Sequence, residues 1–495
     1  MRWRIVFILL FLGGVGTLAF FLVRERLEEK MVARALPVPD GDVEIAWFNT
    51  STGGVAWERF VLGIHRVVRT SANLEMDDSR AFLDQSTATP EIVLSWKDGP
   101  GKLRIRWYKQ TGAIGTSEWI DALAQRNPAP LAIIGGGTSD RALDLAQKLN
   151  DRTQWRGSRP LFFITTATAN EVDLPGGERR SLTQIYPDRT FRFCFTNEQM
   201  AKAVIDFLWQ DAELRPRGGA AAKIEDEPYP VVFPIRWDDD PYSIDLYERF
   251  HQAVQAKTEK RFISQFTSHA AYSVGSFERV NQVEDGIAQN ILAELPIQPG
   301  QRSLLIMPTS TTPARRFLRA LAGDSPLIGR HLVAVNGDAI SINDVYRDGS
   351  LLWNIRDVPI PLVFFAHQNP IGWDEYLPPP TGTDDVLLLA EMVRVLTATI
   401  RPSGGELVRD ADALLRNMRS QKIIAFDGVG NREKGSEFIV CLKPEISGDG
   451  RIGMRAPLQV WTRSARNEWS RVRPEETLLA PALSRPVRRD GPSSP

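Results

Sequence analysis

Cysteine and histidine are scarce in this chain of 495 residues. Two cysteines, Cys194 and Cys441, are too few for a disulfide-stabilised scaffold or for a zinc module with several thiolate ligands. Five histidines occur, and none has HExxH-type spacing, so the sequence predicts neither a metal site nor a cofactor. The chain also has no excess of charge of one sign, since 60 basic residues are balanced by 61 acidic ones. This balance excludes the strongly basic surface that nucleic-acid binding needs.

Sequence motifs of common enzymes are also missing. No Walker loop occurs, and no GxSxG nucleophile elbow is present. Gly135-Gly136-Gly137 lacks the later glycine of a dinucleotide-binding fingerprint, because Ser139-Asp140-Arg141 follows. Without a recognisable nucleophile and base, the chain is predicted not to be an enzyme.

A long apolar run is present at the amino terminus. Residues 5–23 carry no charge and, as a helix, would be about 28 Å long, close to the thickness of a bilayer. Arg2 and Arg4 precede the run, which favours a cytoplasmic amino terminus and an exported body. We therefore expect a single-pass anchor in the cytoplasmic membrane with the body on the periplasmic side. A cleaved signal peptide is the alternative, although its apolar region is usually only about 7–15 residues long.

Short apolar strands alternate with amphipathic helices along the rest of the chain. This rhythm predicts right-handed βαβ crossovers and a parallel sheet, and hence the α/β class. The predicted strands are 43–48, 92–96, 103–108, 131–134, 161–164, 231–235, 304–307, 332–335 and 437–442. The predicted helices are 57–68, 117–125, 140–149, 200–209, 242–256, 280–295, 313–321, 386–399 and 411–420. Residues 215–228 and 376–385 are expected to be surface loops.

Hydroxyl-bearing residues follow two successive predicted strands. Ser139 stands where strand 131–134 turns into a helix, and Thr166 and Thr168 follow strand 161–164. Ligands of parallel sheets gather at the carboxyl ends of strands, and a helix amino terminus favours an anion. These hydroxyls are therefore in a position to meet one ligand. Ordinary capping of the helix and turn is the alternative, and either motif alone would favour it.

The order of these segments resembles the type I periplasmic binding proteins, in particular the branched-chain amino-acid (Leu/Ile/Val) receptor branch of ABC transporter substrate-binding proteins. Phe60-Val61-Leu62-Gly63-Ile64 resembles the xxxGI pattern of that family's first helix. Each further match is diffuse, but the matches follow the family's order over residues 42–445. The matching segments are 131–149, 161–172, 191–208, 237–254 and 427–438. In segment 237–254, Asp240, Tyr242 and Phe250 match the family pattern.

The resemblance implies two α/β lobes with parallel sheets flanked by helices, joined by three hinge crossovers and preceded here by the transmembrane helix. Residues 1–41 would form the membrane anchor and linker. The first lobe would comprise 42–196 with 358–420, and the second 197–357 with 421–475. Residues 476–495 are expected to form a disordered tail.

The resemblance also implies a ligand site in a cleft between the lobes. Ser139 and Thr168, with backbone groups of Thr166, would take the α-carboxylate of an amino acid. Asp338, which follows strand 332–335, would take the ammonium group, and Tyr242 and Trp57 would line the cleft. The sequence departs from the family where Gly136 and Thr165 replace prolines and where residues 310–312 lack an aromatic side chain.

The expected function is that of a membrane-anchored extracytoplasmic solute-binding protein that takes a small polar, amino-acid-like ligand. ABC-type uptake or sensing would be its use, with an ABC permease or a membrane signalling protein as its partner. A scaffold or sensor with a degenerate cleft is the first alternative. An enzyme that works in the same cleft is the less favoured one.

Overall fold

The computed structural model describes most of residues 33–472. Outside the described part are 1–32, 84, 86–87, 219–222, 225–226, 229, 238–239, 260, 265–279, 324–325, 341–344, 346–354, 356–357, 371–382, 403–404, 445–455, 457, 465 and 473–495. The expected anchor at 5–23, most of the expected loop at 376–385 and the expected tail lie there. Among the helices that are described, none is long and apolar enough to cross a bilayer.

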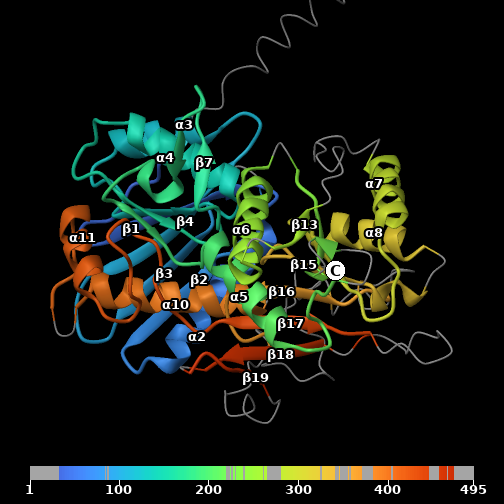
Figure 1. Cartoon of the computed structure of the whole chain (residues 1–495). Coiled ribbons are helices and arrows are strands. Elements are labelled where there is room, and N and C mark those ends of the chain that lie inside the picture. The colour runs from blue at the N-terminus through green and yellow to red at the C-terminus, as the bar shows by residue number, and fades with distance from the viewer. Residues whose placement is uncertain are drawn as a thin grey trace, which may run out of the picture.

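A seven-stranded sheet forms the centre of the first lobe, in the order β2-β3-β4-β1-β5-β6-β9 (Figure 1). The neighbouring strands β4 and β1, β1 and β5, β5 and β6, and β6 and β9 are parallel pairs. Strand β3 pairs antiparallel with both of its neighbours, β2 and β4. The strands are β1 (Val43–Thr50), β2 (Leu74–Arg80), β3 (Glu91–Trp96), β4 (Lys102–Gln110), β5 (Ala132–Gly135), β6 (Leu161–Ile164) and β9 (Thr190–Arg192).

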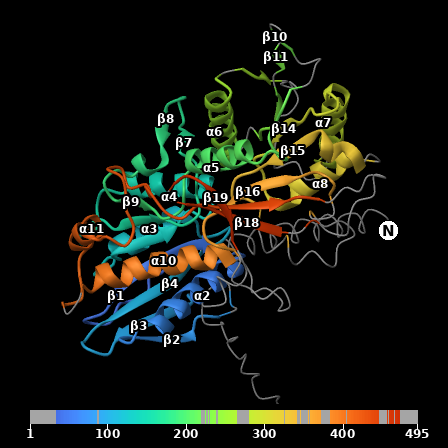
Figure 2. The ribbon, with the colours of Figure 1, turned by 60° about the horizontal axis from the view of Figure 1, so that its bottom comes forward.

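Helices cover both faces of this sheet. One apolar cluster joins it to α2 (Gly54–Thr70), α10 (Thr383–Ile400) and α11 (Ala411–Ser420). A second cluster joins the other face to α3 (Thr116–Gln125) and α4 (Ser139–Asp151). Figure 2 shows α10 beside α2, although more than 300 residues separate them in the sequence.

An eight-stranded sheet forms the second lobe, in the order β13-β12-β14-β15-β16-β17-β18-β19. The strands from β13 to β16 are parallel, and β17, β18 and β19 add antiparallel. Their bounds are β12 (Val231–Pro234), β13 (Ile263–Ser264), β14 (Ser303–Ile306), β15 (Leu332–Val335), β16 (Leu362–Ala366), β17 (Phe438–Leu442), β18 (Leu458–Arg463) and β19 (Trp469–Arg471).

The second sheet is also covered on both faces. Helices α5 (Asn197–Gln210) and α6 (Pro241–Lys257) share one apolar cluster with it. Helices α7 (Val280–Glu294) and α8 (Thr311–Ala322), with the 3-10 helix η2 (Pro326–Arg330), cover the other face. Each helix buries its apolar side against a sheet, which gives each lobe a three-layer architecture.

Sheet membership moves two of the expected lobe boundaries. The expected return to the first lobe at residue 358 precedes β16, yet β16 lies between β15 and β17 in the second sheet. Its five residues are all buried, which is typical of a central strand. The segment from residue 421 also stays with the first lobe up to Asn431, which pairs in parallel with Arg192. The chain therefore changes lobe between β9 and α5, between β16 and α10, and between Asn431 and β17.

Candidate functional site

The two hydroxyl-bearing loops meet at the edge of the first sheet that faces the second lobe. Ser139 is the first residue of α4, and its hydroxyl accepts a hydrogen bond from the Ala169 N–H at 3.3 Å. The Thr166 hydroxyl donates to the Gly137 carbonyl at 2.9 Å. The expected proximity of these loops is thus present, but both hydroxyls are used within the first lobe.

Thr168 is different, because its hydroxyl is not used in a hydrogen bond with any described residue. The side chain is fully buried, and Oγ1 has no hydrogen-bond partner in the described structure. The Thr168 carbonyl accepts from the N–H of Asn197, the first residue of α5, at 2.8 Å. Thr168 therefore lies at the first crossover between lobes. Leaving such a hydroxyl unpaired costs about 1–3 kcal/mol, which is a reason to look for a ligand or water beside it.

The amino terminus of α4 adds backbone donors to the same loop. Its N-cap residue, Thr138, makes no side-chain capping bond. Free N–H groups in a first helical turn carry partial positive charge and favour an anion. Gly136 prepares the turn with φ at 69°, and a Cβ there would lie 2.8 Å from that of Ala142. The proline that Gly136 replaces has φ near −65° and would not fit this turn.

Asp338 supplies the acidic group of the second lobe, just beyond β15. Its Oδ2 lies 2.8 Å from Nε2 of His367, while Oδ1 is buried without a hydrogen-bond partner in the described structure. Tyr242 lies beside it and accepts the Ala339 N–H on its hydroxyl at 3.2 Å. Burial, and then the charge of Asp338, raise the pKa of the Tyr242 phenol well above its usual value. The phenol is therefore neutral, and its hydrogen bond with the Asp338 side chain favours this neutral form.

Asn197 links the two halves of this junction. Its side-chain amide donates to the Tyr242 carbonyl at 3.3 Å and to Asp245 at 2.9 Å. Its Oδ1 is another buried atom without a hydrogen-bond partner in the described residues. From Thr168 through Asn197 to Tyr242, contacts therefore lead from the first lobe towards Asp338.

Comparison with known proteins decides the fold. No family model matches the chain, and no curated protein matches it. A leucine-binding protein from Thermotoga maritima superposes with a TM-score of 0.51 at 15% identity, over 84% of this chain and 98% of that one. A solute-binding protein from R. palustris, solved in complex with benzoate, gives a TM-score of 0.51 at 12% identity, over 84% and 97%. The chain has the type I periplasmic-binding-protein fold. This confirms the two-lobed α/β fold that the resemblance implied.

Within the type I fold, Trp57 does not belong to the lobe junction. It is 1% exposed and packs against Trp47, Phe60 and Trp107 in the core of the first lobe. Its indole N–H donates to the Ala81 carbonyl at 2.7 Å, so the side chain has no polar group left for a ligand. This corrects the expectation that Trp57 lines a cleft.

His367 also lies at the junction between the lobes, and the sequence analysis did not predict it. The Phe195 N–H donates to its Nδ1 at 3.4 Å, so Nδ1 is unprotonated and Nε2 carries the hydrogen that Asp338 accepts. His367 thereby connects the first crossover to Asp338. A signal did exist: His367 directly follows the apolar run of β16, at the carboxyl end of a parallel strand.

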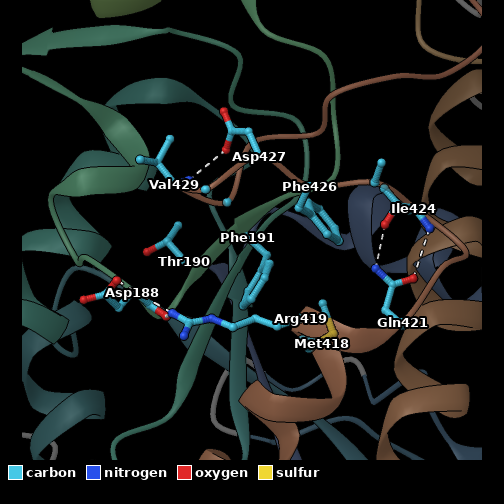
Figure 3. Close-up of a pocket in the computed structure, with 13 residues that line it drawn as sticks. Asp188, Thr190, Phe191, Met418, Arg419, Gln421, Ile424, Phe426, Asp427 and Val429 are labelled. Carbon is cyan, nitrogen blue, oxygen red and sulfur yellow. Dashed lines mark hydrogen bonds and ion pairs between the residues drawn. The ribbon is translucent and has the colours of Figure 1, made fainter.

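A separate cavity of about 320 Å³ lies in the first lobe, between the end of β9, α11 and the turn that follows (Figure 3). Phe191 and Phe426 form part of its lining, with ring centroids 5.2 Å apart. Its polar side chains bond within the walls: Gln421 binds the backbone of Ile424, and Asp427 accepts the Val429 N–H. None of the residues predicted for the ligand site lines it.

Proposed function

We propose that this chain is a membrane-anchored extracytoplasmic solute-binding protein that holds a small polar ligand between its two lobes. The observation that carries the proposal is a pair of buried oxygen atoms that can still bind a ligand: Thr168 Oγ1 in the first lobe, which has no hydrogen-bond partner in the described structure, and Asp338 Oδ1 in the second, which has the Tyr242 hydroxyl near its side chain. Unsatisfied polar atoms are rare in folded interiors, and a ligand that donates and accepts hydrogen bonds would satisfy both.

An amino-acid-like ligand fits the charges of this junction. Its carboxylate would lie by the uncapped start of α4 and the Thr168 hydroxyl, where partial positive charge favours an anion. Its ammonium group would lie by Asp338, because a buried cation needs a carboxylate to offset its loss of hydration. Thr166 would contribute backbone groups, Tyr242 would shape the wall, and His367 would hold Asp338 in place.

Binding between two hinged lobes works by population shift. Only the closed form offers contacts from both lobes, so a ligand that uses both favours closure. In the membrane, such a body would deliver its solute to an ABC permease or report it to a signalling protein. The amino-terminal run 5–23 would keep it at the periplasmic surface.

Catalysis is the less favoured use of this junction. Burial raises the pKa of the Cys194 thiol to about 12, so it is no nucleophile at neutral pH. Burial likewise raises the pKa of the Cys441 thiol. His367 is engaged on both ring nitrogens. The described junction residues thus bind and orient, and no nucleophile with a free base occurs among them.

A thermal-shift screen of the full-length protein in detergent against amino acids, amides and small carboxylates tests the proposal. A solute at a hundred times its dissociation constant should stabilise the fold by about 2.7 kcal/mol. The shift should shrink in Asp338→Asn, which removes charge but keeps shape, and persist in Asp427→Asn at the separate cavity. A screen without any hit, or a hit that Asp338→Asn leaves unchanged, would contradict the proposal.

A scaffold with a degenerate cleft is the second candidate. It is favoured by the observation that the protein's own groups already use the Ser139 and Thr166 hydroxyls. A screen in which every solute gives no shift, with a folded protein, would favour this scaffold.

A further inference from the structure

Contact between the lobes extends beyond the crossovers. Helix α6 of the second lobe packs against β7 (Glu171–Asp173) and α4 of the first lobe. Figure 1 shows α6 at the side of the second lobe that faces β7. The loop after β6 and the hairpin of β7 with β8 (Arg179–Ser181) thus meet the polar face of α6.

Asp245 is the centre of this contact. It is fully buried on α6, and its Oδ2 accepts the backbone N–H of Asn170 at 2.7 Å. Its Oδ1 accepts the backbone N–H of Glu171 at 3.3 Å and Nε of Arg249 at 3.2 Å. Both backbone donors belong to the first lobe. Hydrogen bonds from N–H groups to a carboxylate are stronger than those between neutral groups, and here water is excluded.

Two ion pairs flank Asp245 and also join the lobes. Arg249 of α6 lies 3.0 Å from Glu171 of the first lobe. Arg179 of the first lobe lies 2.6 Å from Glu248 of α6. These side chains are more exposed than Asp245, so each pair contributes less than the buried carboxylate.

We propose that these contacts form an interlobe latch that keeps the lobes closed without any solute. The latch consists of Asp245, Glu248 and Arg249 on α6 with Asn170, Glu171 and Arg179 of the first lobe. Opening the hinge would separate a buried carboxylate from two backbone donors and break two ion pairs at once. The contacts involve only groups of this chain, so the latch is independent of the proposed solute.

The latch changes what a solute can do. A ligand shifts a hinge equilibrium only as far as the unliganded protein occupies the open form. With the latch formed, a solute or partner meets a closed body, and breaking the latch becomes a separate step. Weakening the latch should therefore enlarge the open population through which a solute reaches the junction.

Distance measurement by electron spin resonance tests the latch. The full-length chain carries spin labels on Gln125→Cys in α3 and Ala256→Cys in α6, while Cys194 and Cys441 are buried and not labelled. Without solute, the unmodified latch should give one narrow distance distribution. Asp245→Asn should raise the open-to-closed ratio at least tenfold, an effect of the order expected for a broken buried, charge-assisted contact.

Asp206→Asn is the matched control. Asp206 is also a buried carboxylate with two cationic partners, Lys257 and Arg463, but all three belong to the second lobe. It should leave the interlobe distance unchanged. A mostly open unmodified chain, an unchanged distribution in Asp245→Asn, or equal opening in Asp206→Asn would overturn the latch.

A charge swap decides the matter if Asp245→Asn does not fold. Arg179→Glu places two acids face to face at the rim and should raise the open population about threefold or more. Arg179→Glu with Glu248→Arg restores opposite charges and should return the distribution to the closed form. Opening that the second substitution fails to reverse would contradict the latch.

Discussion

At the scale of single residues, buried hydroxyls in this protein fall into two groups. Thr190 is 3% exposed and donates to the Tyr186 carbonyl at 2.7 Å. Thr168 is equally buried, but its hydroxyl has no hydrogen-bond partner in the described structure. The first hydroxyl stabilises the fold. The second costs free energy, which is the expected behaviour of a group kept for binding.

Replacing each hydroxyl by a methyl group separates these roles. Thr168→Val should leave the free energy of unfolding unchanged or raise it by about 1 kcal/mol, because an unpaired polar group is removed. Thr190→Val should lower it by about 1–2 kcal/mol, because the Tyr186 carbonyl loses its donor. Urea denaturation of both variants in the absence of solute measures the difference. Equal destabilisation of the two would mean that Thr168 has a partner after all.

Residue-level reasoning from the sequence predicted part of the proposed site. Ser139, Thr166, Thr168, Asp338 and Tyr242 follow or flank strand ends, and the topology of a parallel sheet gathers such positions. The prediction that Trp57 lines the cleft was wrong, because an aromatic residue near a loop can equally pack in a core. Burial of this kind is not visible in the sequence. His367 was missed because its partner, Asp338, is 29 residues away.

At the scale of elements, close contact between α2 and α10 joins two distant parts of the first lobe. Gly63 of α2 makes this contact tight, because a Cβ there would lie 3.0 Å from the Ala390 nitrogen and 3.2 Å from the Leu389 Cβ. The glycine in the FVLGI pattern therefore serves helix packing. It lets α10, which follows the second crossover, return onto the first lobe.

Gly63→Val tests this helix contact. The larger side chain should force α2 and α10 apart and lower the free energy of unfolding by about 1–3 kcal/mol. Gly54→Ala, at the start of the same helix, has no atom within 4 Å of the added Cβ. It should be neutral or stabilising by up to about 1 kcal/mol. Thermal or urea unfolding compares the two, and equal stability would contradict the packing role.

Elements were predicted better than their connections. Continuous apolar runs marked most central strands, because both faces of these strands are buried. Apolar residues at helical spacing marked most helices, because one face of each is buried. The edge strand β2 was missed, since its sequence LEMDDSR is largely polar and exposed. Strand β16 was also missed, although its run LVFFA has the composition of a buried strand.

At the scale of the whole molecule, the junction between the two lobes contains both the proposed solute site and direct contacts between the lobes. The α/β class and the two-lobed order followed from periodicity and from the resemblance. The latch did not, because Asp245 meets Asn170 across 75 residues and two lobes. Such a contact depends on how the lobes are placed relative to each other, which local sequence patterns do not encode.

Affinity measurement on the best solute of the screen tests the central claim most directly. Titration calorimetry would compare the unmodified chain with Thr168→Val, Asp338→Asn and the double variant, each checked for unchanged folding by circular dichroism. If the solute binds between the lobes, each single variant should lose at least tenfold in affinity, and the double variant should lose more. Affinity that stays the same in all three variants would contradict a solute site at this junction.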